Sequence, residues 1–111
     1  MPEAGVEGDF LSDQKRVAAF KKKHGLRSSP EHAALDLASE VGELAKEILS
    51  SSDYGRKRFK KTRAAAGELG DVYYSLLFLA NELGVDADAE LCGALRKYEA
   101  RLRKRGSPGS K

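Results

Sequence analysis

Two short stretches of the sequence each carry a pair of carboxylates three residues apart, and this feature constrains the fold most strongly. The four residues are Glu40 and Glu43 in the first stretch, and Glu68 and Asp71 in the second. On an α-helix, residues three apart lie on one face, so two such helices side by side would bring four carboxylates together. Like charges at that spacing need compensation, and a hard divalent cation such as Mg²⁺ is the usual source. The pattern therefore predicts a metal site between two helices.

The rest of the sequence is typical of one small globular domain. Its 111 residues are 41% hydrophobic and 33% charged, which indicates a folded chain with a modest core that contacts between copies help to complete. We find no apolar run long enough to span a membrane and no secretory signal, so we expect a cytoplasmic protein. The single cysteine, Cys92, is predicted to be a small buried residue. A net charge of +3 permits phosphate-bearing partners without indicating nucleic acid.

Helix start and stop signals predict four helices and no strand. The helices should run from Ser12 or Asp13 to about His24, from the Ser28-Ser29-Pro30-Glu31 start to about Ser50, from about Arg63 to Leu83, and from Asp86 into the last basic stretch. We expect a flexible tail at 1–9, one all-α domain at 10–105 and a second flexible tail at 106–111.

The two middle helices differ in their apolar patterns. In the second, Leu37, Val41, Leu44 and Ile48 form a core stripe, beside an acidic row made of Asp36, Glu40, Glu43 and Glu47. The third helix is apolar over too broad an arc for a single stripe, so we expect it to be buried on most sides, at the centre of a bundle or a dimer. Its two carboxylates would then need a partner, and a metal ion is a good one.

A basic run, Arg56 to Lys61, separates the two acidic helices. Two interpretations stay open for it. It is either a basic flap that approaches a polyphosphate or nucleic acid, or a solvated connector.

The order of these motifs resembles the MazG-like nucleoside triphosphate pyrophosphohydrolases of the all-α NTP pyrophosphatase superfamily. The resemblance is carried by Glu40-Val-Gly-Glu43-Leu, Glu68-Leu-Gly-Asp71-Val, the Leu83-Gly-Val-Asp86 turn and a basic last helix. It covers about residues 29–103. It implies a four-helix MazG-like bundle completed by dimerisation, as a homodimer or a dimer of dimers.

The resemblance also implies a reaction. This is Mg²⁺-dependent hydrolysis of an NTP or dNTP between the α and β phosphates, giving a monophosphate and pyrophosphate, in clearance of unwanted nucleotides. Glu40, Glu43, Glu68 and Asp71 would be the catalytic residues and would hold Mg²⁺, with Mn²⁺ as an alternative. Lys97 and Arg101, which match the family's Lys-Phe-x-x-Arg-Phe stretch, would bind substrate phosphates.

The sequence departs from the family pattern at two places. Ser39 stands where the family often has a further glutamate, and no asparagine lies beside the last-helix motif. Phosphoribosyl-ATP pyrophosphatases and dUTPase- or dCTPase-like enzymes are close relatives that the sequence does not separate.

Two alternatives come from other classes. A di-iron bundle needs Glu-x-x-His pairs, which neither His24 nor His32 supplies. A non-enzymatic helical protein could use the basic run and the C-terminal end to bind nucleic acid or a partner. We do not expect nucleic acid, because it leaves the four carboxylates unexplained.

Overall fold

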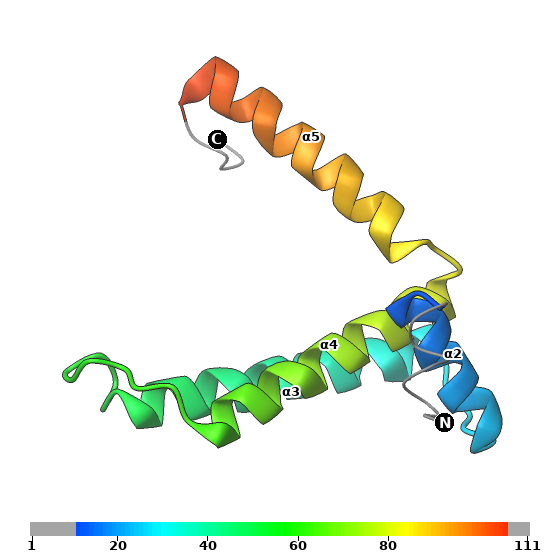
Figure 1. Ribbon diagram of the computed structural model, residues 1–111, viewed down its shortest axis with the longest axis horizontal. Coiled ribbons are helices and arrows are strands. Elements are labelled where there is room, and N and C mark those ends of the chain that lie inside the picture. Colours follow the sequence, from blue (N-terminus) through cyan, green and yellow to red (C-terminus); the bar gives the residue numbers. More distant parts are fainter. Residues whose placement is uncertain (1–10, 107–111) are drawn as a thin grey trace.

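The protein is a helical molecule in which three helices lie together and the last extends away from them (Figure 1). The computed structural model describes residues 11–106. In this range there are no strands, and the helices are α2 (Asp13–Lys23), α3 (Pro30–Ser51), α4 (Arg63–Leu83) and α5 (Ala87–Arg105). The prediction of an all-helical chain with four helices is therefore confirmed over the described residues. The predicted tails lie outside them, except for Gly106, which caps α5. No described helix is long and apolar enough to cross a lipid bilayer.

Each helix starts at a polar cap, which the start signals predicted for all of them except α4. In every case the cap side chain accepts a hydrogen bond from a backbone N–H two or three residues further on, which satisfies a group that the helix leaves unpaired. The caps are Ser12, Ser29, Thr62 and Asp86. Gly84 ends α4 in the left-handed region, with φ of 68°, where glycine adopts the conformation without a steric penalty.

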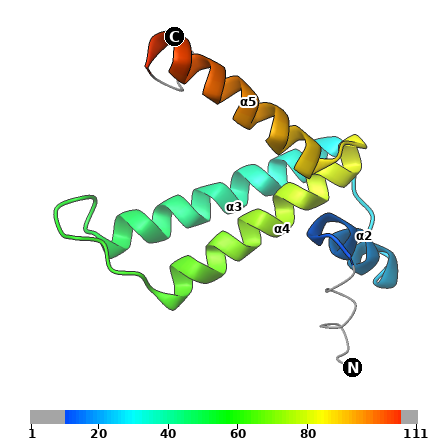
Figure 2. The same ribbon diagram turned by 45° about the horizontal axis from the view of Figure 1, so that its top comes forward.

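The two long helices, α3 and α4, form an antiparallel pair that is joined by the loop at one end of the molecule (Figures 1 and 2). α2 packs against α4 near the other end. The buried apolar side chains of the described residues are few and mostly small: Ala33, Ala65, Leu77 and Ala80. Small residues allow the helix backbones to approach closely, but they contribute little apolar area to the core.

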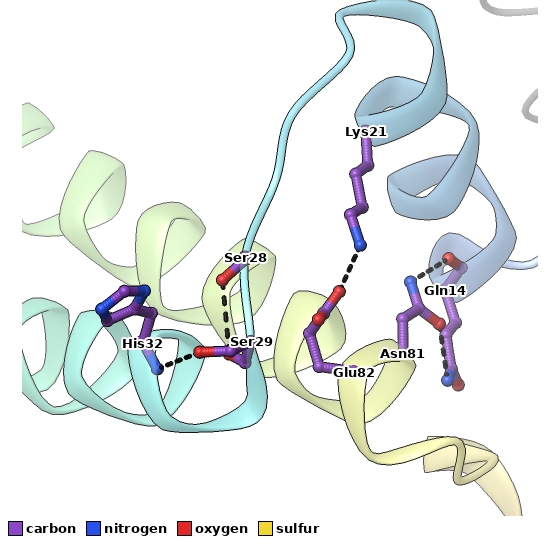
Figure 3. A network of polar contacts seen from close by, with 7 residues as sticks. All are labelled: Gln14, Lys21, Ser28, Ser29, His32, Asn81 and Glu82. Atoms are coloured by element: carbon purple, nitrogen blue, oxygen red, sulfur yellow. Dashed lines mark hydrogen bonds and ion pairs between the residues drawn. The ribbon is translucent and has the colours of Figure 1, made fainter.

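Polar contacts join α2 to the C-terminal end of α4 (Figure 3). The Gln14 Nε2 donates to Asn81 Oδ1 at 3.0 Å, and Asn81 Nδ2 donates back to the Gln14 carbonyl at 3.2 Å. Lys21 forms an ion pair with Glu82, which is 10% exposed. Gln14 also accepts a hydrogen bond from the backbone N–H of Ala87 at 2.8 Å, so it ties α2 to the first residue of α5.

α5 leaves this corner and runs away from the α3 and α4 pair (Figures 1 and 2). None of its residues is buried. The exposed side chains include an apolar stripe at spacings of four, three and four, which consists of Leu91, Leu95, Tyr98 and Leu102. Cys92 is exposed, so the prediction that it is buried is wrong for the single chain.

α4 is also less covered than its sequence predicted. Leu69 and Leu76, exposed by 59% and 46%, face no neighbour that buries them. The prediction that this helix is buried on most sides therefore does not hold for the single chain, because α5 does not pack on it.

Candidate metal centre

Three carboxylates meet between the two long helices. Ligand oxygens of Glu40 on α3 and of Glu68 and Asp71 on α4 all lie within 4.8 Å of one another. Two oxygens bound to one Mg²⁺ lie about 4 Å apart at most, so small rotamer changes suffice to bring this set onto an ion. Carboxylate oxygens are also the donors that hard divalent cations prefer. The residues present therefore fit a divalent metal ion.

The hairpin that joins the helices sets the register that brings these side chains together. Near the loop, the Thr62 hydroxyl that caps α4 donates to Glu47 Oε2 at 3.3 Å. Glu40 lies about two turns before Glu47 on α3, and Glu68 lies between one and two turns after Thr62 on α4. Because the helices run antiparallel, these offsets place Glu40 opposite Glu68.

Partial burial and the neighbouring negative charges raise the pKa of the Glu68 carboxyl group above its usual value. The largest cause is partial burial, which disfavours the charged form. The nearby negative charges of Asp71, Glu43 and Glu40 act in the same direction, and so does a hydrogen bond with Asp71. The cluster thus has a deficit of positive charge that either a proton or a cation can relieve.

Glu43 and Asp71 do not lie entirely as the sequence predicted. Glu43 is near enough for its charge to act on Glu68, but its oxygens do not belong to the group that converges. Asp71 does belong to it, yet its side chain is exposed rather than buried, so the prediction of a buried acidic pair is wrong for the single chain. Asp71 is exposed for the same reason as Leu69 and Leu76, because α5 does not pack on α4.

A small cavity is lined by residues that lie one helical turn from the carboxylates on α3 and α4. Its volume is about 200 Å³, and its lining includes Asp36 and Ser75. Asp36 precedes Glu40 by four residues and Ser75 follows Asp71 by four, so both lie one turn further along the same helix faces. Arg27 and Phe78 also line it, which combines a cation and an aromatic surface. The pocket therefore lies about one helical turn beyond the carboxylates along the α3 and α4 pair.

The sequence patterns that predicted the carboxylates did not identify this pocket. Ser75 could have been found from its helical spacing after Asp71, but Arg27 lies in the connection before α3 and carries no motif. Its position depends on how α2 docks, which is a tertiary contact.

The predicted substrate-binding residues lie on α5, away from the carboxylates of the same chain (Figure 1). Lys97 and Arg101 both approach the ring of Tyr98, with the Lys97 Nζ at 5.1 Å and the Arg101 Cζ at 5.7 Å from its centroid. They therefore form one basic site on one face of α5. The single chain does not bring that site to the carboxylates.

The fold and this geometry define a class of protein, an all-helical protein with a carboxylate site between antiparallel helices. Comparison with family models identifies the group within that class. The model described as the MazG nucleotide pyrophosphohydrolase domain matches residues 28–106, which include α3, α4 and α5. The chain belongs to the MazG nucleotide pyrophosphohydrolase family. Searches of curated proteins and of solved structures gave no significant match.

Proposed function

We propose that the protein hydrolyses a nucleoside or deoxynucleoside triphosphate between its α and β phosphates, and so removes unwanted nucleotides from the pool. The observation that carries this proposal is the convergence of Glu40, Glu68 and Asp71, in a chain whose family acts on nucleotides. In the reaction, a water oxygen bonds to phosphorus while the bridging P–O bond between the α and β phosphates breaks. The products are a nucleoside monophosphate and pyrophosphate.

Glu40, Glu68 and Asp71 would hold the metal ion, which we propose to be Mg²⁺, with Mn²⁺ as a substitute. When bound, the ion neutralises phosphate oxygens and lowers the pKa of a bound water. Glu43 lies close to the cluster but outside the converging oxygens, so it is available to accept the proton of the attacking water. The four sequence-predicted carboxylates would thereby divide into ligands and a base.

The neighbouring cavity supports a particular orientation of the nucleotide in the site. Its volume of about 200 Å³ suits only part of a nucleotide, and its lining mixes Phe78 and Tyr74 with polar groups. We propose that the nucleoside end extends towards it.

We further propose that the protein works as a homodimer or a dimer of dimers. The supporting observation is the large apolar area that the single chain leaves exposed on α4 and α5. A second cavity of about 530 Å³ between α2 and α4, lined by Val17, Phe20, Tyr73 and other residues, adds to this uncovered surface. In such an assembly, α5 of one copy would cover α4 of another and bring Lys97 and Arg101 to a carboxylate site.

The experiment that tests the reaction is pyrophosphate release from a panel of canonical and modified NTPs and dNTPs, with Mg²⁺ and with EDTA. The nucleotide product is measured in the same samples. We expect a monophosphate and pyrophosphate in equal amounts, and only with the metal. Release of inorganic phosphate with a diphosphate product would contradict cleavage between the α and β phosphates. Absence of turnover on the whole panel would count against an enzymatic role.

A further inference from the structure

Six cations lie close together where the chain returns from α3 to α4. The basic segment, residues 56–63, contains Arg56, Lys57, Arg58, Lys60, Lys61 and Arg63 and no acidic residue. All six are exposed. Within residues 11–106, the ion pair of Arg56 with Asp53, at 3.9 Å, is the only one that involves this segment. The other five positive charges therefore lack an acidic partner in the described part of the chain.

The turn that leads into this segment is held by hydrogen bonds. Ser52 is buried, its hydroxyl accepts from the Gly55 N–H at 3.2 Å, and its carbonyl accepts from the Lys57 N–H at 2.9 Å. The backbone of Tyr54 adopts the left-handed region, with φ of 58°, which is strained for a residue with a side chain. The side chain itself is 69% exposed. The basic segment therefore begins at a turn that hydrogen bonds hold in one conformation.

One half of the segment leads directly into the helix that carries Glu68 and Asp71. Arg63 is the first residue of α4 and precedes Glu68 by five residues, a rise of about 7.5 Å and a rotation of about 140° around the helix axis, so it lies on another face of α4 than Glu68. Lys60 and Lys61 come immediately before Thr62, whose hydroxyl donates to Glu47, about two turns from Glu40 on α3. Arg56 and Lys57 come earlier in the loop, on the turn that follows α3, where their backbone N–H groups donate to the carbonyls of Asp53 and Ser52.

The α3 and α4 pair consequently has different chemistry on the two sides of the carboxylates. Beyond the carboxylates in one direction lies the pocket with Asp36, Ser75 and Phe78. In the other direction lies the basic segment. A nucleoside triphosphate has the same asymmetry, with an aromatic base at one end and its highest negative charge on the terminal phosphates at the other.

We propose that Lys60 and Lys61 bind the β and γ phosphates of the substrate, the pair that leaves as pyrophosphate. This inference rests on the proposed function, because it takes the α–β bond to lie at Glu40, Glu68 and Asp71. With that bond fixed and the nucleoside in the pocket, the terminal phosphates extend towards the basic segment. Charge-assisted contacts from the two lysines then select triphosphates over shorter nucleotides.

The test is a calorimetric titration with inorganic pyrophosphate in the presence of Mg²⁺, because it requires no turnover. Lys60→Ala/Lys61→Ala is compared with Arg56→Ala/Lys57→Ala, which removes the same charge from the turn that follows α3. We expect the first variant to bind about tenfold or more weakly, the typical effect of losing charge-assisted contacts. The second should stay within about threefold of wild type, because it changes only long-range electrostatics, which salt screens.

Equal weakening in the two variants, or none in either, would overturn the proposal. Titration with a single-stranded oligonucleotide tests whether the segment binds nucleic acid instead. If the wild type binds it more tightly than pyrophosphate and both variants lose it equally, the segment is a nucleic-acid surface and the proposal is wrong. Failure of the proposed function looks different, since it leaves pyrophosphate binding and its dependence on Lys60 and Lys61 intact while no nucleotide is hydrolysed.

Discussion

Glu40 on α3 and Glu68 on α4 face each other across an antiparallel helix pair, and Asp71 completes a group whose oxygens lie within 4.8 Å of one another. Without a cation, each carboxylate in this group makes its neighbours harder to ionise. With a divalent cation, the same proximity becomes an advantage, because the ligands are already assembled. The stability and the activity of the protein should therefore respond to metal in ways that single substitutions can separate.

Asp71→Asn should abolish metal-dependent turnover while the helix content stays the same. The amide keeps the shape of the side chain but removes the charge that a divalent cation needs. Loss of even an outer-shell partner typically costs 10–100-fold, so we expect a loss above about 100-fold for a direct ligand. Steady-state rates and circular dichroism measure the two quantities.

The matched control is Glu99→Gln, which removes one negative charge from an exposed position on α5. It should leave turnover unchanged. Wild-type activity in Asp71→Asn would remove Asp71 from the site, and equal losses in both variants would indicate an effect of net charge.

The raised pKa of Glu68 predicts how the metal-free protein responds to pH. The folded state holds the Glu68 proton more tightly than the unfolded chain does, so stability falls as pH rises from the ordinary glutamate pKa through the raised value. In EDTA at about pH 7, Glu68→Gln should have a higher Tm than wild type, because the amide removes the repulsion. At about pH 3.5 the difference should vanish, since Glu68 is then protonated in both states.

Added Mg²⁺ should reverse the order at about pH 7, because only the wild type gains full metal binding. Thermal unfolding at the two pH values, with EDTA and with Mg²⁺, gives all four comparisons. A Tm difference that is the same at both pH values would show that Glu68 is not repelled by its neighbours.

The helices could be predicted from the sequence because their boundaries depend on local chemistry. Ser12, Ser29 and Asp86 cap their helices with their own side chains, and Gly84 supplies the left-handed residue that ends α4. The i and i+3 spacing of the carboxylates is also local. For these reasons three of the helix starts, and the shared face of each carboxylate pair on its own helix, follow from the sequence. That Glu40 faces Glu68 depends in addition on how α3 packs against α4.

The arrangement of α5 could not be predicted in this way. Its direction depends on the corner at Gln14, whose partners Asn81 and Ala87 are 67 and 73 residues away. Cys92 and the apolar stripe of α5 look like core residues in the sequence, and they are exposed because no neighbour from the same chain covers them. Local patterns indicate that a face will be buried, but not what buries it.

Gln14→Ala should destabilise the protein by about 1–3 kcal/mol, because it leaves polar groups of α4 and α5 without partners. The Gln14 amide donates to Asn81 and to the Val85 carbonyl, at 2.6 Å for the latter, and accepts from the Ala87 N–H. Urea unfolding measures the loss, and hydrogen exchange of the Ala87 amide should become faster. Lys15→Ala, at the exposed neighbouring position, is the control and should change neither quantity.

Leu95→Asp should lower the oligomer mass, because it places a charge in the centre of the exposed stripe on α5. Leu95 is 57% exposed in the single chain, and the stripe has no partner within residues 11–106 that buries it. Ala100→Asp, nearly opposite on the same helix, should leave the mass unchanged. Light scattering during size-exclusion chromatography measures both. A monomeric wild type at micromolar concentration would contradict the proposed assembly.

Lys97→Ala/Arg101→Ala should raise KM by about 10–100-fold with a smaller change in kcat, because these cations share one face and would bind substrate phosphates. In the single chain they lie away from the carboxylates, so we expect them to act on the site of a partner copy. This arrangement is tested by unfolding the variant together with Asp71→Asn, at equal amounts, and refolding the mixture. Half of the dimers are then mixed, and each has one intact site, so at a substrate concentration far below KM the activity should recover to about a quarter of wild type. A raised KM without recovery would mean that α5 reaches the carboxylates of its own chain, and unchanged kinetics would mean that Lys97 and Arg101 do not bind substrate.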